Sequence, residues 1–214
     1  MANRRDGKST GGYLIGMSSN ALLSGDRTHV TIVSWSTNKL KRVARSSLAA
    51  EVQAMSNAED ELHVVRGAWA EFNGTPFNLD NPDETIASVP GTVIVDAKSI
   101  YDTLVSQNQP LQLQEKRTAI ELLAYLHNTE ANKTMTRWVH GEANLADAPT
   151  KLNASKMLRE FMTTSTWLIV QDEKQQSAKK RKALGLDKLE NEKGENKRPP
   201  QFRDYAVTRL RDLA

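Results

Sequence analysis

The stretch Ser46-Ser47-Leu48-Ala49-Ala50-Glu51-Val52 opens the most regular segment of the chain. From Leu48 onward, apolar residues recur at steps of three and four, which predicts one long helix with a continuous apolar face. Ser46 or Ser47 can cap its start, because a serine oxygen accepts a hydrogen bond from an amide of the first turn. The apolar face comprises Leu48, Val52, Met55, Ala58, Leu62, Val65, Trp69 and Phe72.

Two strands are predicted before this helix and one after the loop that follows it. Residues 11–17 and 28–36 are rich in strand-forming residues, and the turn between them contains Ser24-Gly25-Asp26. Residues 73–90 are rich in Gly, Pro, Asn and Asp and predict a loop. Thr92-Val93-Ile94-Val95 is a short apolar run without polar alternation, which is typical of a strand buried on both faces.

The rest of the chain alternates between helical and extended patterns. An amphipathic helix is predicted over 111–128, with Leu113, Ile120, Leu123 and either Leu126 or His127 on its inner side. Further helices are predicted over 97–106, 144–152 and 155–164, and extended segments over 134–140 and 167–170. This order of elements indicates the mixed α/β class.

The composition excludes several classes of protein. There is no cysteine, so disulfides, thiolate nucleophiles and cysteine-based zinc sites are excluded. No run approaches the roughly 18 apolar residues that a membrane-spanning helix needs. No apolar run follows the basic residues at the N-terminus, as it would in a secretory signal. We therefore expect an intracellular protein, in the cytoplasm or nucleus, with no membrane partner.

Positive charge is concentrated at the C-terminal end. Residues 172–214 carry 12 Lys and Arg against 8 Asp and Glu, a net charge of +4, whereas the first 171 residues carry 17 against 18, a net charge of −1. We expect a domain over 1–170, a charged disordered linker over 171–200 and a short helix or disordered tail over 201–214. Lys179-Lys180-Arg181-Lys182 is a candidate nuclear-import or polyanion-binding patch, although such runs are more often solvated surface.

Three acids stand where a metal-dependent nuclease would place them. Asp96 follows a predicted buried strand, at the end where open α/β sheets bind ligands. Glu51 lies in the first turns of the long helix beside its apolar face, and Asp147 opens a predicted helix after a strand. Hard oxygen ligands of this kind suit two Mg²⁺ ions about 4 Å apart, which clamp the attacking and leaving oxygens of a phosphodiester.

Each of these residues also has a purely structural interpretation. Asp96 can cap the helix that follows it. Glu51 and Asp147 can be ordinary acids near helix N-termini, where the helix dipole favours negative charge. His140 is either a proton shuttle or a hydrogen-bonded histidine at the end of a strand. No single residue distinguishes a catalytic role from a structural one. The order of the motifs along the chain is therefore the stronger evidence.

Five segments, in sequence order, resemble the ribonuclease H domain of copia-type (long-terminal-repeat) retrotransposon Pol polyproteins. Asp6-Gly7-Lys8-Ser9-Thr10-Gly11-Gly12-Tyr13 is similar to the family's Asp-Arg-Lys-Ser-Thr-Ser-Gly-Tyr stretch, and Val33-Ser34-Trp35-Ser36-Thr37-Asn38-Lys39-Leu40-Lys41 to its Ser-Trp-Lys-Ser-Lys-Lys-Gln strand end. Val43-Ala44-Arg45-Ser46-Ser47-Leu48-Ala49-Ala50-Glu51 resembles Val-Ala-Leu-Ser-Ser-Thr-Glu-Ala-Glu. Val95-Asp96-Ala97-Lys98-Ser99 stands where the family has Cys-Asp-Asn-Gln-Ser, and Asn144-Leu145-Ala146-Asp147-Ala148-Pro149-Thr150-Lys151 is close to Gln-Leu-Ala-Asp-Ile-Leu-Thr-Lys.

The resemblance covers about residues 6–151 and implies a ribonuclease H-like mixed sheet, ordered 3-2-1-4-5 and flanked by helices. It implies that Glu51, Asp96 and Asp147 are catalytic residues that bind Mg²⁺. His140 is a further catalytic candidate, although histidine is not a fixed part of the family pattern there. The implied activity is endonucleolytic hydrolysis of the RNA strand of RNA–DNA hybrids, with the reverse transcriptase region of the same polyprotein as a further partner.

One departure from the family bears on activity. The family's first strand lies at the centre of the sheet, carries the first catalytic aspartate and precedes the Lys-Ser-Thr stretch, whereas only Met1 to Arg5 precede Asp6 here. We therefore expect an N-terminally truncated domain that is inactive by itself. The alternative is a non-catalytic nucleic-acid- or protein-binding remnant with a basic tail. An unrelated α/β domain whose acids are only helix caps is disfavoured by the ordered motifs.

Overall fold

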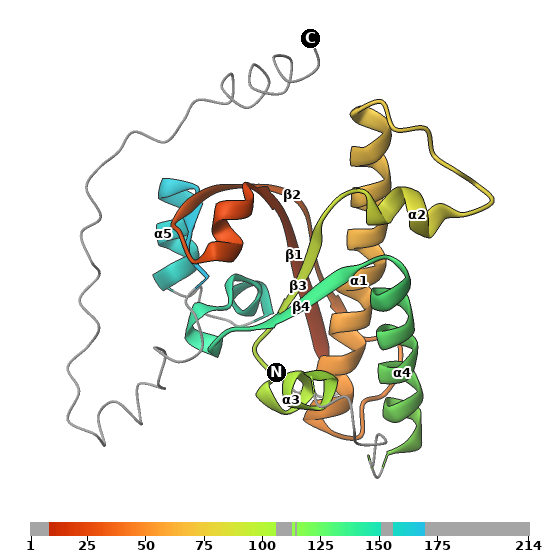
Figure 1. Ribbon diagram of the computed structural model, residues 1–214. Coiled ribbons are helices and arrows are strands. Elements are labelled where there is room, and N and C mark those ends of the chain that lie inside the picture. The colour runs from red at the N-terminus through yellow and green to blue at the C-terminus, as the bar shows by residue number, and fades with distance from the viewer. Residues whose placement is uncertain (1–8, 106–112, 114, 151–155, 170–214) are drawn as a thin grey trace.

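The computed structural model describes residues 9–105, 113, 115–150 and 156–169 (Figure 1). The predicted linker at 171–200, the predicted tail at 201–214 and the basic patch at 179–182 lie outside these ranges. Within the described ranges, no helix is both long enough and apolar enough to span a membrane.

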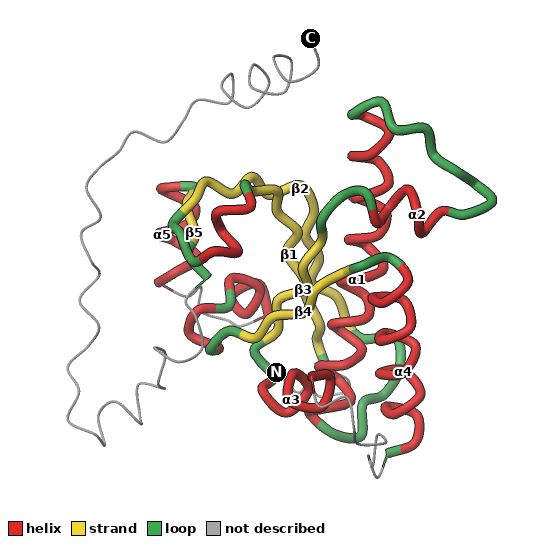
Figure 2. The backbone as a smooth tube through the Cα atoms, viewed as in Figure 1, coloured by secondary structure: helices red, strands yellow, loops and turns green. Residues whose placement is uncertain are grey.

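The strands form two separate sheets (Figure 2). β1 (Thr10–Ser18) and β2 (Thr28–Lys39) form an antiparallel hairpin, and β5 (Thr166–Trp167) pairs with the other edge of β2. β3 (Gly91–Val95) and β4 (Thr134–Trp138) form a parallel pair. The mixed α/β class is therefore confirmed, but one continuous mixed sheet is not formed, because no described strand lies between β1 and β3 to join them.

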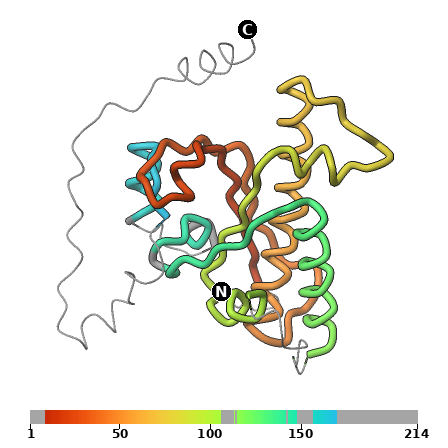
Figure 3. The backbone as a smooth tube through the Cα atoms, viewed as in Figure 1, coloured from red at the N-terminus to blue at the C-terminus, as the bar shows by residue number. Residues whose placement is uncertain are grey.

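The long helix α1 (Ser47–Phe72) packs against both sheets (Figure 1 and Figure 3). Ser46 caps it, since its Oγ accepts a hydrogen bond of 3.0 Å from the backbone N–H of Ala49. A Cβ built on Gly11 of β1 would lie 2.6 Å from a methyl carbon of Leu40 and 3.3 Å from the Cβ of Ala54, so a larger residue here would displace Leu40 and press on α1. The predicted apolar face runs past the core at its far end, where Phe72 is 81% exposed.

The remaining helices follow the predicted pattern with two differences. The region predicted as a loop contains α2 (Pro82–Ala87), whose first turn holds a proline and two acids, a favourable composition for a helix start. The helix predicted over 144–152 is instead a 3₁₀ segment, η3 (Leu145–Thr150). The other helices are η1 (Asn20–Ser24), α3 (Lys98–Val105), α4 (Lys116–Ala131), η2 (Gly141–Ala143) and α5 (Lys156–Thr164).

The inner face of α4 differs from the predicted one. Ile120 and Leu123 are 66% and 54% exposed, whereas the adjacent Leu122 is buried. Tyr125 is also buried, and its hydroxyl lies 2.6 Å from the Thr136 hydroxyl of β4. Burial raises the pKa of Tyr125. Apolar residues occur on more than one side of this helix, so periodicity alone could not select the side that faces β4.

Two apolar clusters make up the core of the described residues, and the first also reaches the parallel pair through Ile94 and Val139. The first joins the β1–β2 hairpin to α5 and η3, and its buried members are Leu22, Val30, Val139, Ala143, Leu145, Phe161 and Ile169. The second joins α1 to β3, α3 and α4, and its buried members are Val52, Met55, Val93, Val95, Ile100, Leu122 and Tyr125.

A buried polar network holds α1 against the parallel pair of strands. The guanidinium of Arg66, a residue only 3% exposed, donates from Nε to the carbonyl of Val89 at 2.7 Å and from Nη1 to the Thr134 hydroxyl at 2.6 Å. Its Nη2 donates to the carbonyl of Asn132 at 2.7 Å. The Asn132 amide in turn donates to the buried Glu59 carboxylate at 2.8 Å. Burial lowers the pKa of Arg66, and the charge of Glu59 opposes that shift.

We predict that Arg66→Met lowers the free energy of unfolding by about 3 kcal/mol or more, because Glu59 remains buried without its counter-charge. Arg66→Lys should also destabilise, since one ammonium group cannot reproduce the planar fork that contacts three acceptors. Urea denaturation followed by circular dichroism measures both changes.

The matched control for this prediction is Arg27→Met. Arg27 lies 4.0 Å from Glu160, and both side chains are about half exposed. Its removal should change the free energy of unfolding by less than about 0.5 kcal/mol. Equal, small effects of the two methionine variants would contradict a structural role for the buried network.

Candidate active site

The carboxyl ends of β3 and β4 are held side by side at the position of Asp96. β3 ends at Val95, whose carbonyl accepts a hydrogen bond of 2.9 Å from the backbone N–H of Val139. The indole Nε1 of Trp138 donates to the carbonyl of Asp96 at 2.9 Å. The predicted location of Asp96 at the end of a buried strand is therefore confirmed, and Trp138 fixes the backbone there.

Two carboxylates converge beside Gly141. A Cβ built on Gly141 would lie 3.4 Å from Oδ2 of Asp96 and 3.8 Å from Oδ2 of Asp147. The two oxygens are thus no farther apart than the sum of these two distances, although their residues belong to different elements. Both residues are half-buried. Two half-buried carboxylates that lie near the same position attract a cation electrostatically.

Glu51 approaches this region from α1. It lies in the first turns of the helix, as predicted, and is half-buried. Glu51, Asp96 and Asn144 line one cavity of about 450 Å³, which is bounded by β1, β3 and α1 and is called the inter-sheet groove below. The structure therefore places Glu51 on the wall of the groove that Asp96 also reaches.

His140 lies next to the pair of carboxylates through the chain, because it directly precedes Gly141. Its ring makes an edge contact with Trp138, with centroids 6.4 Å apart and an interplanar angle of 85°. Lys98 lies on the same indole, with its Nζ 4.9 Å from the ring centroid. Trp138 thus connects the Asp96 backbone, a histidine and a cation at one strand end.

The carboxylate oxygens of the candidate site suit Mg²⁺, but too few acidic residues are grouped together to hold two ions. Carboxylate oxygens are the hard ligands that Mg²⁺ prefers. In the described part of the chain, however, no three or more His, Cys, Asp or Glu residues are grouped closely enough to hold a metal ion. The residues present therefore do not form a two-metal site, and the binding of Mg²⁺ stays a prediction.

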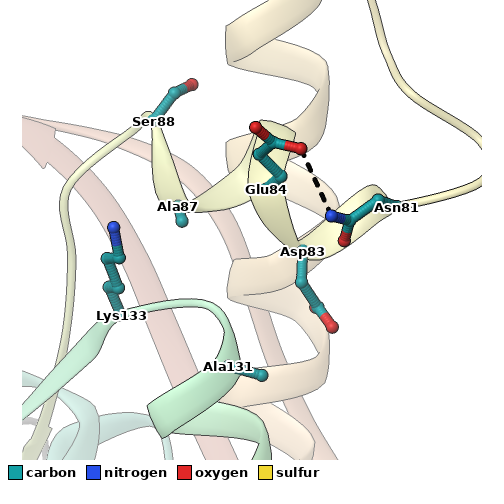
Figure 4. A pocket seen from close by; sticks show the side chains of 7 residues that line it. All are labelled: Asn81, Asp83, Glu84, Ala87, Ser88, Ala131 and Lys133. Carbon is teal, nitrogen blue, oxygen red and sulfur yellow. Dashed lines mark hydrogen bonds between the residues drawn. The ribbon is translucent and has the colours of Figure 1, made fainter.

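A second hollow, of about 480 Å³, lies between α2 and the end of α4 (Figure 4). Its lining residues are Asn81, Asp83, Glu84, Ala87, Ser88, Ala131 and Lys133. The side chains of Asp83 and Glu84 point in different directions, and Glu84 accepts a hydrogen bond of 3.2 Å from the Asn81 amide. This hollow brings no reactive groups together, so the carboxylates near Gly141 remain the stronger candidate site.

Comparisons of the chain with protein-family models, with curated proteins and with solved structures gave no significant match. The assignment of a function therefore rests on the residues and their geometry.

Sequence reasoning did not identify Trp138 or Gly141 as parts of the site. Trp138 falls within the extended segment predicted over 134–140, and hydrophobic periodicity gives it no role in a site. The sequence feature that could have identified Trp138 is its position at the end of β4, the strand that pairs in parallel with β3. Gly141 marks the place where the two carboxylates approach each other, since a Cβ built there would be in van der Waals contact with both.

We predict that Trp138→Phe lowers the free energy of unfolding by about 1 kcal/mol, because it removes a hydrogen bond to the Asp96 carbonyl. Trp167→Phe is the matched control, since its buried Nε1 has no hydrogen-bond partner among the described residues. The control should be neutral or stabilising. Urea denaturation measures both variants, and a larger loss for Trp167→Phe would contradict this account.

Proposed function

We propose that this chain is a ribonuclease H-like domain of copia-type retrotransposon lineage, which binds RNA–DNA hybrids and needs a further strand to hydrolyse the RNA. The observation that carries the proposal is the convergence of Asp96 and Asp147 beside Gly141, at the carboxyl ends of parallel strands. Glu51 reaches the same groove as Asp96. These are the three acids that the resemblance marks as metal ligands.

The strand arrangement supports the proposal. The resemblance implies a sheet ordered 3-2-1-4-5, in which the first strand separates the hairpin from the parallel pair. In the present chain the hairpin β1–β2 and the pair β3–β4 border one groove, and no described strand lies between β1 and β3. That is the arrangement expected of this sheet without its central strand.

The incomplete set of acids supports inactivity of the chain by itself. Cleavage by two metal ions needs enough carboxylates to hold both ions about 4 Å apart. The described residues contribute Asp96, Asp147 and Glu51, whereas the resemblance implies a fourth acid, on the strand that precedes the Lys-Ser-Thr stretch. Lys98, on the indole beside Asp96, supplies a positive charge that can contact a phosphate.

The second candidate function is a non-catalytic remnant that binds nucleic acid or protein through its basic tail. The absence of a group of three metal ligands in the described ranges favours this candidate. Under either candidate the protein works in the cytoplasm or nucleus. A reverse transcriptase region of the same polyprotein is a partner only under the first.

The test is Mg²⁺-dependent cleavage of a labelled RNA–DNA hybrid by two proteins. One is the chain as it stands, and the other carries an N-terminal extension with the first strand of a copia-type ribonuclease H. We expect cleavage by the extended protein alone. Asp96→Asn in the extended protein should slow cleavage by about 100-fold or more, because a metal ligand contributes several kcal/mol to transition-state stabilisation.

The control substitution is Asp60→Asn. Asp60 is an exposed acid of α1 that does not line the groove, so its loss should leave the cleavage rate within about threefold. Cleavage by the unextended chain that disappears in Asp96→Asn would overturn the proposed inactivity. Failure of both proteins to bind or cleave the hybrid would overturn the family assignment.

A further inference from the structure

The face of the hairpin that points away from α1 carries an exposed aromatic side chain. Ser34 lies on the α1 side of β2, because its hydroxyl donates a hydrogen bond of 2.8 Å to the Glu61 carboxylate of α1. Successive residues of a strand point to opposite faces, so Trp35 lies on the other side. Its side chain is 69% exposed. An indole that is fixed on a strand and open to solvent is a surface on which another flat ring can stack.

A run of basic residues begins where this strand ends. Its members are Lys39, Lys41, Arg42 and Arg45, and residues 39–45 are called the basic connection below. Lys39 lies on the same face of β2 as Trp35, roughly 13 Å farther along the strand. From residue 27 to residue 50 the chain contains no Asp or Glu. Positive charge is therefore concentrated beside the indole, although the first 171 residues together carry a net charge of −1.

Contacts with the rest of the protein hold the basic connection in place. Leu40 is buried, and the Arg42 guanidinium pairs with the Glu121 carboxylate of α4. Lys41 and Arg45 are exposed, and neither forms an ion pair with another residue that the structure describes. Two positive charges on an anchored segment are thus available to an anionic partner.

This surface is distinct from the candidate active site. The inter-sheet groove, which Glu51 and Asp96 line, contains no residue from 31 to 45. Binding at Trp35 and the basic connection requires neither the carboxylates near Gly141 nor a further strand. The inference therefore goes beyond the proposed function and does not depend on it.

The combination of groups favours single-stranded nucleic acid over other anionic partners. Lysine and arginine contact the phosphates of any nucleic acid, whatever its sequence. Unpaired bases can also stack on an aromatic side chain. In a duplex the bases are stacked on one another, and an acidic peptide offers carboxylates without flat rings. Only single-stranded nucleic acid uses both the indole and the positive charges.

We propose that this surface binds single-stranded RNA or DNA without sequence preference. One base stacks on the indole of Trp35, and neighbouring phosphates contact the basic connection through Lys41 and Arg45. The bound nucleic acid crosses the face of the hairpin opposite α1. RNA and DNA share the phosphates and the base faces on which this recognition depends.

The test measures the fluorescence anisotropy of fluorescein-labelled oligo(U) and oligo(dT) of about 12 nucleotides with the full chain. Both should bind saturably and within about threefold of each other, because stacking and phosphate contacts are common to the two. Polyglutamate at the same concentration of charge should compete poorly, because it has no bases.

Two substitutions of the indole test the stacking. Trp35→Ala should weaken the binding of both oligonucleotides by about tenfold, and Trp35→Phe should weaken it less, since a smaller ring still stacks. Phe72→Ala is the matched control, because Phe72 is an 81% exposed ring at the far end of α1. It should leave binding unchanged.

The salt dependence of binding tests the phosphate contacts. The double variant Lys41→Gln/Arg45→Gln should reduce the slope of log K against log salt concentration by roughly 1.4, since each phosphate contact to a single strand contributes about 0.7. Lys133→Gln/Arg159→Gln removes the same charge from exposed positions elsewhere and should preserve the slope.

Three results would overturn the inference. Absence of saturable binding of either oligonucleotide would remove it directly. Equal effects of Trp35→Ala and Phe72→Ala would show binding without stacking on this indole. Loss of binding only when residues 179–182 are all changed to glutamine would assign it to the C-terminal basic patch. Each result concerns the binding of a single strand, so cleavage of a hybrid by the extended protein tests the proposed function separately.

Discussion

The guanidinium of Arg66 is enclosed in the protein, and its hydrogen bonds join elements that are far apart in the chain. Its acceptors are Val89 before β3, Asn132 in the turn before β4 and Thr134 at the start of β4, so one side chain on α1 sets the start of both parallel strands. A buried charge is tolerable only when it is paired and fully hydrogen-bonded. Glu59 and Asn132 meet that requirement here.

The geometry of the candidate site follows from this anchoring. With β3 and β4 starting in register, their carboxyl ends also coincide, and Trp138 reaches the carbonyl of Asp96. The chain then turns through Gly141, beside which the carboxylates of Asp96 and Asp147 lie. The site is thus a consequence of the strand register, which brings the ends of β3 and β4 together.

Within the described residues, the hairpin β1–β2 shares no strand pairing with the parallel pair. α1 is the common wall, and Gly11 allows β1 to approach it closely. Much of the apolar face of α1 is half-buried for this reason, since it lines the inter-sheet groove and not a closed core.

Local patterns in the sequence determined the long helix, its serine cap, the strand that ends before Asp96 and the early position of Glu51 in α1, because these depend on residues a few positions apart. Only the tertiary structure decided that Arg66 is buried, since its partners lie 23 to 68 residues away. It also decided which side of α4 faces inward, that the strands form two sheets, and that Asp96 and Asp147 meet beside Gly141. Such outcomes depend on which distant surfaces come together, and hydrophobic periodicity carries no information about that choice.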